Sequence, residues 1–447
     1  MNIYIELEVY NREIESKILL AINSLKKGLK VFIGQRSVIH EMALAGNLVP
    51  GIIHMKDVYG GFDVYTKNRR EIINIIKNLK KKNFFFTAQD EELGIMSENF
   101  REFSKLRFNN LSVFKNLIYY FCVGSRDFKY LNSKCKGNTL VKSGTPRFDI
   151  LRLKSKNNYK KKSQIAIICN FNIFGQNNLS DRIFDSLNHK ESNFLKEKTI
   201  YQKEKMQIEK VYEFIQLARF LAISFPKKKI LVRPHPKDNF ENWKKILGRK
   251  NKNLLLDFKT SLSETILDSE YIIQNGCTSS IESFFLNSKC ISYHPNKWPD
   301  IRGDIHGKFA NKLCINANTK KDVKEIIKKR LNTKKKNLLN HLEKRIYLNN
   351  KNAYEIIINS WNKIFDNNEI LLNKENNVNK ILLFNNIKSL IKKILLIKET
   401  HKDNTFPKFE KKHLYQIISK IKNDLNLKDE IRIKKLNNKL IYLEIVK

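Results

Sequence analysis

Short apolar runs alternate with amphipathic stretches over the first 150 residues of the chain. The runs at residues 3–7 and 30–33 predict two strands, and the stretch between them carries apolar side chains at helical spacing. Gly28 suits the end of that helix. Strands that alternate with helices in this way predict a mainly parallel sheet with right-handed crossovers. Further strands are expected at residues 52–54, 84–86 and 119–123.

The same alternation starts again after a basic, polar segment at residues 153–163. A long helix is expected at residues 206–225. Strands are expected at residues 165–169, 230–232, 254–256, 271–273 and 290–293. The pattern predicts an α/β protein with two Rossmann-like domains, at residues 1–155 and 160–335, that face each other across a cleft. Ligands in such sheets bind beyond the carboxyl ends of the strands.

Beyond residue 335 the pattern becomes helical and strongly basic. We expect residues 336–365 to form helices that pack back on the α/β core, and residues 366–447 to form a basic helical extension. The amphipathic piece at residues 387–397 fits a helix that lies on a membrane surface. It also fits a helix packed on its own domain, which is the commoner use of such a pattern.

The charge balance of the 447 residues is extreme, with 85 Lys and Arg against 45 Asp and Glu and a formal net charge of +40. An excess this large fits a nucleic-acid-binding or membrane-surface protein. It also fits mutational bias, because Lys, Asn and Ile are abundant while Arg and Gly are scarce. We favour the second explanation for the globular part and expect no specific nucleic-acid partner. The excess is denser in the C-terminal third, so peripheral association with the inner face of the cytoplasmic membrane stays open.

Cysteine usage and the length of the apolar runs indicate a cytoplasmic protein. The six cysteines include no C-x-x-C pair, so they predict reduced core thiols rather than a zinc site or a disulfide framework. The N-terminus has no basic segment followed by an apolar one, which a signal peptide needs. No apolar run approaches the roughly 20 residues that span a bilayer.

An Arg-Pro-His-Pro segment at residues 233–236 follows one of the predicted strands. Each proline pushes the residue before it into an extended conformation, so Arg233 and His235 should project from the strand exit on the same side. A guanidinium and an imidazole in that place neutralise a phosphate without a metal. The same segment also fits a rigid turn with a surface arginine and a capping histidine.

Small hydroxyl residues follow the predicted strand at residues 271–273. Gly276 permits a tight turn or a close backbone approach, and Thr278, Ser279 and Ser280 are good N-cap residues. A helix N-terminus with exposed hydroxyls and free N–H groups binds anions, although simple capping explains most such sequences. The position after a strand of the same domain as the Arg-Pro-His-Pro segment favours a shared phosphate site.

Acidic residues after strands of the first domain are candidates for a catalytic base. Asp90, Glu91 and Glu92 follow the apolar run at residues 84–86. A carboxylate there fits either a solvated loop or a base that deprotonates an acceptor hydroxyl from the opposite side of the cleft. A second charged set lies near the end of the first strand and in the loop that follows: Glu6, Glu8, Arg12 and Glu13.

Several other polar residues follow predicted strands or turns and are candidates to line the cleft. They are Arg147 near the end of the first domain, Asn170 and Asn172 at the first turn of the second, and His294 after a later strand. No D-x-D sequence is present, which argues against the common metal-dependent sugar-transferase site. We therefore expect neither a metal nor any other cofactor.

Together these motifs resemble those of bacterial surface-carbohydrate (lipopolysaccharide and capsule) biosynthesis proteins with a GT-B-like fold, over residues 1 to about 330. The His-Pro and Ser-Ser pairs are similar to those of sialyl-, polysialyl- and Kdo-type transferases. In those enzymes the histidine and the hydroxyls bind the phosphate of a CMP-sugar, and an acidic-acidic-Gly motif supplies the base. Here Leu93 separates Glu92 from Gly94, and the resemblance favours Glu92 as the base, then Glu91. By analogy with other GT-B enzymes, Glu282 would hold the nucleotide ribose.

The resemblance implies a metal-independent glycosyltransferase that moves a sugar from a nucleotide donor to a hydroxyl of a carbohydrate or lipid-linked acceptor. A CMP-activated nonulosonic acid is one candidate donor. His235, Ser279 and Ser280 would stabilise the departing phosphate, with Arg233 in support. The enzyme alternatives are a CDP-polyol phosphotransferase of the teichoic-acid type and a nucleotide-sugar epimerase. A basic nucleic-acid or membrane-surface binding protein is the alternative from a different class.

Overall fold

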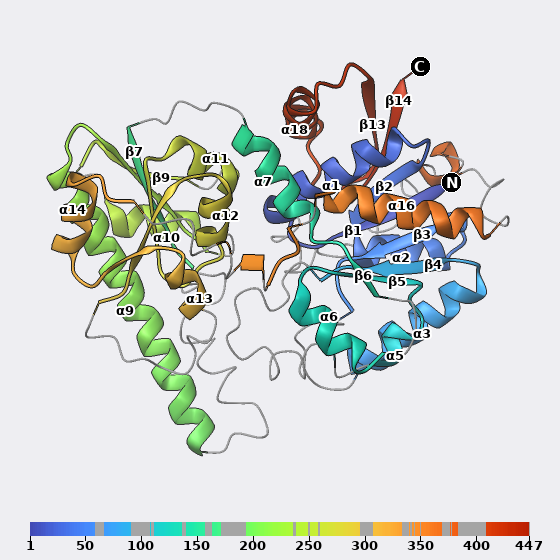
Figure 1. Cartoon of the computed structure of the whole chain (residues 1–447), viewed down its shortest axis with the longest axis horizontal. Coiled ribbons are helices and arrows are strands. Elements are labelled where there is room, and N and C mark those ends of the chain that lie inside the picture. The colour runs from blue at the N-terminus through green and yellow to red at the C-terminus, as the bar shows by residue number, and fades with distance from the viewer. Residues whose placement is uncertain are drawn as a thin grey trace, which may run out of the picture. The chain divides into compact units, whose positions relative to one another are not determined.

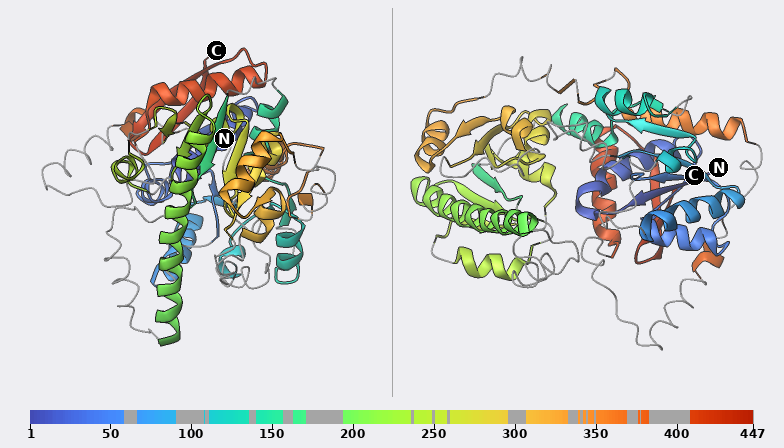
Figure 2. Two further views of the ribbon diagram at one scale, coloured as in Figure 1. Left: turned by 90° about the vertical axis from the view of Figure 1, so that its left-hand side faces the viewer. Right: turned by 90° about the horizontal axis from the view of Figure 1, so that it is seen from below.

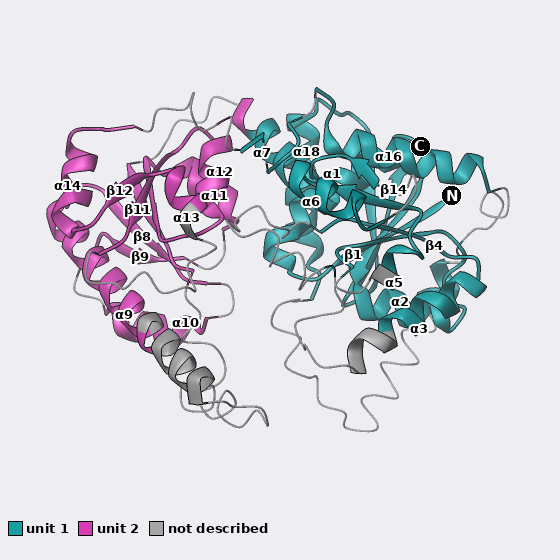
Figure 3. Cartoon of the chain, turned by 60° about the horizontal axis from the view of Figure 1, so that its bottom comes forward, with its two compact units in different colours: residues 1–95, 99–154, 340–447 teal, residues 96–98, 155–339 magenta. Residues whose placement is uncertain are grey.

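The chain forms two compact units in a computed structural model (Figure 3). Unit 1 holds residues 1–95, 99–154 and 340–447, and unit 2 holds residues 96–98 and 155–339. The structure describes residues 1–58, 67–90, 108, 111–135, 140–156, 163–170, 194–235, 238–248, 251–257, 260–295, 307–332, 339, 342–343, 345–348, 350–368, 376, 378–382 and 408–446.

A single eight-stranded sheet forms the centre of unit 1. Its strands are β1 (Asn2–Leu7), β2 (Lys30–Gln35), β3 (Ile52–Met55), β4 (Phe85–Ala88), β5 (Tyr119–Cys122), β6 (Leu140–Lys142), β13 (Glu430–Asn437) and β14 (Leu440–Val446). The order is β13-β14-β2-β1-β3-β4-β5-β6. β1 to β6 are parallel, which confirms the predicted alternation of strand and crossover helix.

Helices cover both faces of the unit 1 sheet (Figure 1). They are α1 (Tyr10–Leu25), α2 (Arg36–Leu44), α3 (Lys67–Lys81), α5 (Leu111–Phe114), α6 (Ser125–Asn132), α7 (Pro146–Lys156), α16 (Ala353–Asp366) and α18 (Lys411–Asp424). α1 packs against α16 and α18 on one face, and α2 packs against α3 on the other. The core on the α2 side includes Phe32, Ile53 and Phe86, all fully buried.

The end of the chain differs from the helical extension expected over residues 366–447. Its described part contains α18 and a β-hairpin, and the second hairpin strand, β14, pairs antiparallel with β2. Leu440, Ile441 and Leu443 of β14 are fully buried, so the hairpin completes the sheet of unit 1. The amphipathic piece at residues 387–397 lies outside the described residues.

A six-stranded parallel sheet forms the centre of unit 2. Its strands are β7 (Gln164–Ile168), β8 (Lys229–Arg233), β9 (Leu254–Leu256), β10 (Tyr271–Gln274), β11 (Lys289–Tyr293) and β12 (Ile315–Ala317). The order is β12-β11-β10-β7-β8-β9. The chain runs outward from β7 to β9, then resumes beside β7 with β10 and runs outward on the other side. This is the doubly wound order of Rossmann-type sheets.

Helices also cover both faces of the unit 2 sheet (Figure 2). They are α9 (Phe194–Ser224), α10 (Phe240–Leu247), α11 (Leu262–Asp268), α12 (Ser279–Phe285), α13 (Gly307–Lys312) and α14 (Lys320–Lys328). α9 packs against α14, while α11 and α13 both pack against α12. Among the described residues, no helix combines the length and the apolar character needed to cross a membrane.

Candidate active site

The doubly wound order of unit 2 places the two segments predicted to bind phosphate at its topological switch point. β7 lies between β8 and β10, so the loops that follow these three strands meet at one edge of the sheet. Ligands bind at this edge in open α/β sheets. Arg233 ends β8 and His235 follows it, while Gly276 lies two residues beyond β10. The structure therefore brings these three residues to the same edge.

Hydrogen bonds of Asp238 fix the turn that carries His235. Asp238 Oδ2 accepts hydrogen bonds from His235 N at 3.3 Å and from Trp243 Nε1 at 3.0 Å. Asp238 N donates in return to the His235 carbonyl at 2.8 Å. Trp243 is fully buried in the unit 2 core, so the turn is anchored to the interior of the domain. The His235 side chain is half-buried, which leaves part of it open to solvent.

Asn275, which follows β10, joins the carboxyl ends of β7, β10 and β11. Its carbonyl accepts a hydrogen bond from the Nδ2 group of Asn170, which follows β7. Its own Nδ2 group donates to the Tyr293 carbonyl in β11 at 2.9 Å. The predicted cleft residue Asn170 thus lies directly beside the loop after β10, where it fixes the backbone of that loop.

Two residues that the sequence patterns did not single out hold the next part of this loop. Gln274 Oε1 accepts from Cys277 N at 2.6 Å, and Asn311 Oδ1 accepts from Gly276 N at 3.2 Å. Asn311 also accepts from Ser292 Oγ at 2.6 Å, which ties α13 to β11. Gln274 directly precedes the loop and was visible in the sequence, whereas nothing local marks Asn311. The backbone N–H groups of Gly276 and Cys277 are thus both bonded within unit 2.

The hydroxyls at the start of α12 are less exposed than the sequence predicted. Ser279 and Ser280 are fully buried, and Ser280 Oγ donates to the Cys277 carbonyl at 2.8 Å. Thr278, the N-cap residue, is exposed. Of these three hydroxyls, the one that a ligand reaches directly in this structure is that of Thr278. Glu282 is also buried, with 5% of its surface exposed, and its contact with a nucleotide ribose stays a prediction.

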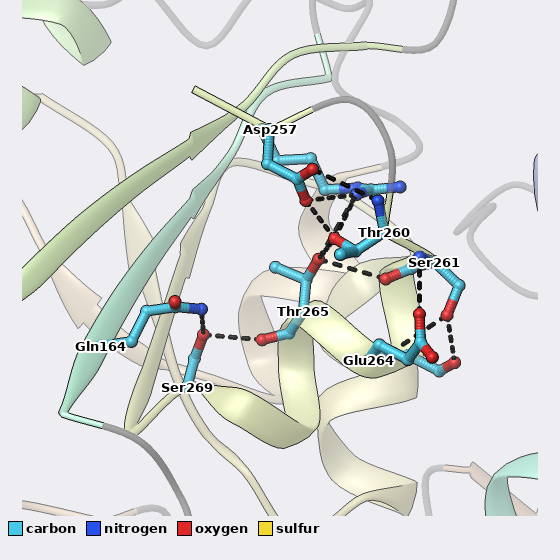
Figure 4. A network of polar contacts seen from close by, with 9 residues as sticks. Gln164, Asp257, Thr260, Ser261, Glu264, Thr265 and Ser269 are labelled. Atoms are coloured by element: carbon cyan, nitrogen blue, oxygen red, sulfur yellow. Dashed lines mark hydrogen bonds and ion pairs between the residues drawn. The ribbon is translucent and has the colours of Figure 1, made fainter. Parts of the chain in front are cut away.

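Arg233 is buried and bonded within unit 2. Its Nη1 group donates to Asp257 Oδ2 at 3.2 Å, Thr265 Oγ1 at 3.3 Å and Thr260 Oγ1 at 3.4 Å. Figure 4 shows these three partners turned toward one another. Burial lowers the pKa of Arg233, while the charges of Asp257 and Glu282 act in the opposite direction. The guanidinium thus fixes the loop after β9 and balances nearby carboxylates.

Replacement of Arg233 by methionine is expected to destabilise unit 2 by about 3–5 kcal/mol, because Asp257 would lose its buried partner. Urea unfolding followed by hydrogen exchange in β7 and β8 measures the loss. Lys244→Met is the matched control, since Lys244 pairs with Glu241 on the surface and such pairs contribute about 0–1 kcal/mol. Equal stabilities of the two variants would contradict the structural role of Arg233.

The remaining cleft candidates lie at separate places. His294 follows β11 at the switch-point edge, is half-buried and donates from its backbone N to the Ala317 carbonyl at 2.9 Å. Arg147 lies in the first turn of α7, in unit 1. Asn172 lies outside the described residues. Of the two that the structure describes, His294 is therefore the one that lies at the switch-point edge of unit 2.

The acids predicted as the base follow β4 in unit 1. Asp90 is fully buried. Glu91 and Glu92 lie outside the described residues, so the identity of the base stays a prediction. Gln89 beside them is fully buried and donates from Nε2 to the Gly144 carbonyl at 2.7 Å, which ties the end of β4 to the loop after β6.

Glu8, Arg12 and Glu13 belong to a charged network at the carboxyl end of β1. Glu13 Oε1 lies 3.1 Å from both Arg12 Nη2 and Lys56 Nζ, and its Oε2 accepts from Glu8 N at 3.0 Å. Lys56 directly follows β3, has 2% of its side chain exposed and also pairs with Glu8. Burial alone would raise the pKa of Glu13, but Lys56 and Arg12 outweigh it and hold that pKa at about 2.

Glu6 forms the other half of this network, inside β1. Its Oε2 accepts from Arg36 Nε at 2.7 Å, and its Oε1 lies 2.8 Å from His40 Nε2. Arg36 also pairs with Asp57 at 3.0 Å. Burial would raise the pKa of Glu6, but Arg36 and His40 hold it at about 2. The sequence patterns did not single out Arg36, His40, Lys56 and Asp57, although the last two lie within three residues of the end of a predicted strand.

Comparison with protein-family models and with curated proteins finds no match. Among solved structures the chain is similar to the S. aureus MnaA–UDP co-structure, with 12% identity and a TM-score of 0.45 over 84% of this chain and 98% of that one. It is similar to the wall teichoic acid polymerase TagF, with 12% identity and a TM-score of 0.43 over 82% of this chain and 89% of that one. It is also similar to MurG of Acinetobacter baumannii, with 9% identity and a TM-score of 0.37 over 81% of this chain and 99% of that one.

Proposed function

We propose that the chain is a glycosyltransferase of bacterial surface-polysaccharide biosynthesis that binds a nucleotide-sugar donor at the switch-point edge of unit 2. The observation that carries the proposal is the position of His235 and of the loop from Asn275 to Thr278 on either side of β7. The imidazole of His235 and the exposed hydroxyl of Thr278 at this edge are groups that can bind an anion. The resemblance of the His-Pro and Ser-Ser motifs supports a nucleotide phosphate as the anion.

In this proposal His235 and Thr278 stabilise the charge that develops on the departing nucleotide phosphate, and such electrostatic stabilisation usually contributes more to catalysis than any other single effect. The acceptor oxygen forms a bond to the anomeric carbon, and the bond from that carbon to the phosphate oxygen breaks. The acceptor proton passes to a carboxylate, for which Glu92, Glu91 and Asp90 are the candidates. No metal or other cofactor takes part.

The surrounding residues keep the site ready for the ligand. Hydrogen bonds with Asn170, Gln274 and Asn311 fix the backbone of the loop after β10. Little conformational entropy is therefore lost when the donor binds. Ser279 and Ser280 pack the start of α12 behind Thr278. Arg233 supports the same edge from within, through Asp257.

Product analysis separates the possible enzyme activities. The full chain is incubated with CMP-N-acetylneuraminate, CDP-glycerol or UDP-N-acetylglucosamine and a mixture of saccharide acceptors, and the products are identified by mass spectrometry. A new glycosidic bond supports the proposal. A phosphodiester would instead identify a polyol phosphotransferase, and an isomerised sugar nucleotide an epimerase. If none of the three donors is consumed and none raises the melting temperature, the proposal fails.

The net charge of +40 favours one further candidate, binding to nucleic acid or to an anionic membrane. α18 presents exposed lysines at positions 411, 412 and 420. Truncation cannot test this candidate, because the tail is part of the unit 1 sheet. Replacement of the three lysines by glutamate keeps the fold and reverses the local charge. Loss of binding to RNA or anionic vesicles in this variant, with nucleotide binding retained, would place such an interaction on α18 beside an intact enzyme.

A further inference from the structure

Two cysteines of unit 2 lie side by side at the edge of its sheet. Cys290 belongs to β11 and Cys314 directly precedes β12, each one residue before the paired residues Ile291 and Ile315. The two cysteines are therefore in register, and neighbouring strands are about 4.7–4.9 Å apart. A disulfide needs Cα atoms about 4.4–6.8 Å apart, so the backbone already has the spacing of a bridge.

The two sulfur atoms are in direct contact. Cys314 Sγ lies 3.0 Å from Cys290 Sγ, so a bond of about 2.05 Å requires the atoms to approach by about 1 Å. Both residues are buried, and buried cysteines also serve as small apolar side chains. Packing alone does not explain the polar contacts of this pair. Cys314 Sγ lies 3.3 Å from the Ala310 carbonyl, and the Ser283 side chain contacts the Cys290 sulfur.

Hydrogen bonds connect Cys314 to the loop after β10. Gln274 Nε2 donates to Cys314 Sγ at 3.3 Å, and Gln274 Oε1 accepts from Cys277 N at 2.6 Å. Cys314 N donates to the Asn311 carbonyl at 3.2 Å, and Asn311 Oδ1 accepts from Gly276 N at 3.2 Å. A displacement of Cys314 therefore reaches the two residues that fix the backbone amides of this loop.

From these contacts we propose that Cys290 and Cys314 form a reversible disulfide, with a peroxide as the oxidant, and that its formation loosens the loop after β10. One peroxide oxygen bonds to the Cys314 sulfur and the other leaves as water, which produces a sulfenic acid. The Cys290 sulfur then bonds to the Cys314 sulfur, and the sulfenic oxygen leaves as water with the Cys290 proton. The two thiols together lose two electrons, which the peroxide gains.

Cys314 is the residue that reacts with the peroxide. Burial raises the pKa of Cys290 and disfavours its thiolate, which is the form that attacks an oxidant. Cys314 has 8% of its surface exposed, against 2% for Cys290, and it directly precedes the edge strand β12. Local opening at such an edge costs less free energy than unfolding of the domain, and it admits the peroxide. The sulfur contact then replaces a collision in solution and favours attack by Cys290.

The bond changes the contacts around Cys314. A disulfide has no thiol hydrogen, so Cys314 no longer donates to the Ala310 carbonyl, and its sulfur moves relative to Gln274. Because each of these hydrogen bonds contributes about 0.5–1.5 kcal/mol, we expect the amides of residues 275–278 to exchange about two- to tenfold faster in the oxidised chain. Thr278 lies in this segment, so a nucleotide should bind more weakly. That last effect rests on the proposed function, whereas the disulfide and the faster exchange do not.

Peptide mapping of the full chain after treatment with hydrogen peroxide tests for the bond. The remaining thiols are alkylated before digestion, and mass spectrometry should find the peptides of Cys290 and Cys314 linked, and separated again by dithiothreitol. Cys290→Ser and Cys314→Ser should each lack the linked peptide. Cys135→Ser is the matched control, because Cys135 is a half-buried thiol of unit 1, and it should form the bond as the unmodified chain does.

Hydrogen exchange of residues 275–278 before and after peroxide treatment tests the coupling to the loop. Exchange should become faster in the unmodified chain and in Cys135→Ser, and should not change in Cys314→Ser. The inference is overturned if peroxide forms no bond between Cys290 and Cys314, or if the bond forms and the exchange stays as slow as in the reduced chain. A chain that forms the disulfide but binds no nucleotide in either state would overturn the nucleotide site alone.

Discussion

A chain that ends at residue 407 is expected to lose the cooperative unfolding of unit 1. The removed segment buries many large apolar side chains, and each such burial contributes about 1.5–3 kcal/mol. Because domains are stable by only about 5–15 kcal/mol, the loss exceeds what unit 1 can absorb. The buried residues of the core in this segment are Phe409, Leu414, Ile417, Ile418, Ile421, Ile431, Ile433, Leu436, Leu440, Ile441, Tyr442 and Leu443.

Hydrogen exchange resolved by segment measures this effect. The amides of β2, which β14 covers, should exchange rapidly in the truncated chain, while those of β7 in unit 2 keep their protection. Arg432→Ala is the control, because Arg432 lies on the same hairpin with 52% of its side chain exposed and surface changes usually stay within about 0.5 kcal/mol. Full protection of β2 in the truncated chain would show that the tail is a separable extension.

Arg36→Met is expected to destabilise unit 1 by about 3–5 kcal/mol. Arg36 donates hydrogen bonds to Glu6 at 2.7 Å and to Asp57 at 3.0 Å. Its removal leaves these two buried carboxylates without their main cationic partner. Chemical denaturation of the full chain, read from the unit 1 transition, measures the loss. Lys77→Met on the exposed side of α3 should change that transition little. A small effect of Arg36→Met would mean that the network is hydrated and open.

The same network makes unit 1 sensitive to acid. The pKa of Glu6 and of Glu13 is about 2 in the folded chain, below the ordinary value of 4.5. As the pH falls from about 5 to about 2, the unfolded chain therefore takes up these protons first, and the free energy of unfolding decreases. Denaturation at pH 7, 5 and 3 checks the direction. Glu13→Gln should flatten the dependence between pH 5 and 3, and a chain equally stable at both values would contradict it.

Most parallel strands of both sheets were predictable because their apolar runs are short, β-branched and bounded by helices. The three-residue edge strands β6 and β12 were missed. The C-terminal hairpin was missed for two reasons. Its lysines and asparagines hid the alternation of buried and exposed residues in β13. Its partner, β2, lies near the opposite end of the sequence, so no local pattern reveals the pairing.

For the candidate site, too, the sequence predicts features that depend on neighbouring residues and misses those that depend on residues far along the chain. The sequence located His235 and Gly276 at strand ends, and the structure brings them to one edge because β7 separates their strands. The direction of the side chains was beyond reach, since it depends on partners far along the chain. Arg233 turns to Asp257, and the amide of Gly276 is held by Asn311. The sequence could thus predict that the segments of His235 and Gly276 lie close together. It could not predict which of their atoms are accessible to a ligand.

Calorimetric titration of the full chain with CMP, CDP and UDP tests the nucleotide site most directly. The unmodified chain is compared with His235→Ala and with His413→Ala, a control on α18 in unit 1 whose ring lies 2.9 Å from the Tyr10 hydroxyl. We predict that at least one nucleotide binds the unmodified chain and the control equally, and that His235→Ala weakens this binding about tenfold or more. Equal binding by His235→Ala, or no binding of any of the three nucleotides, would contradict a nucleotide site at the switch point of unit 2.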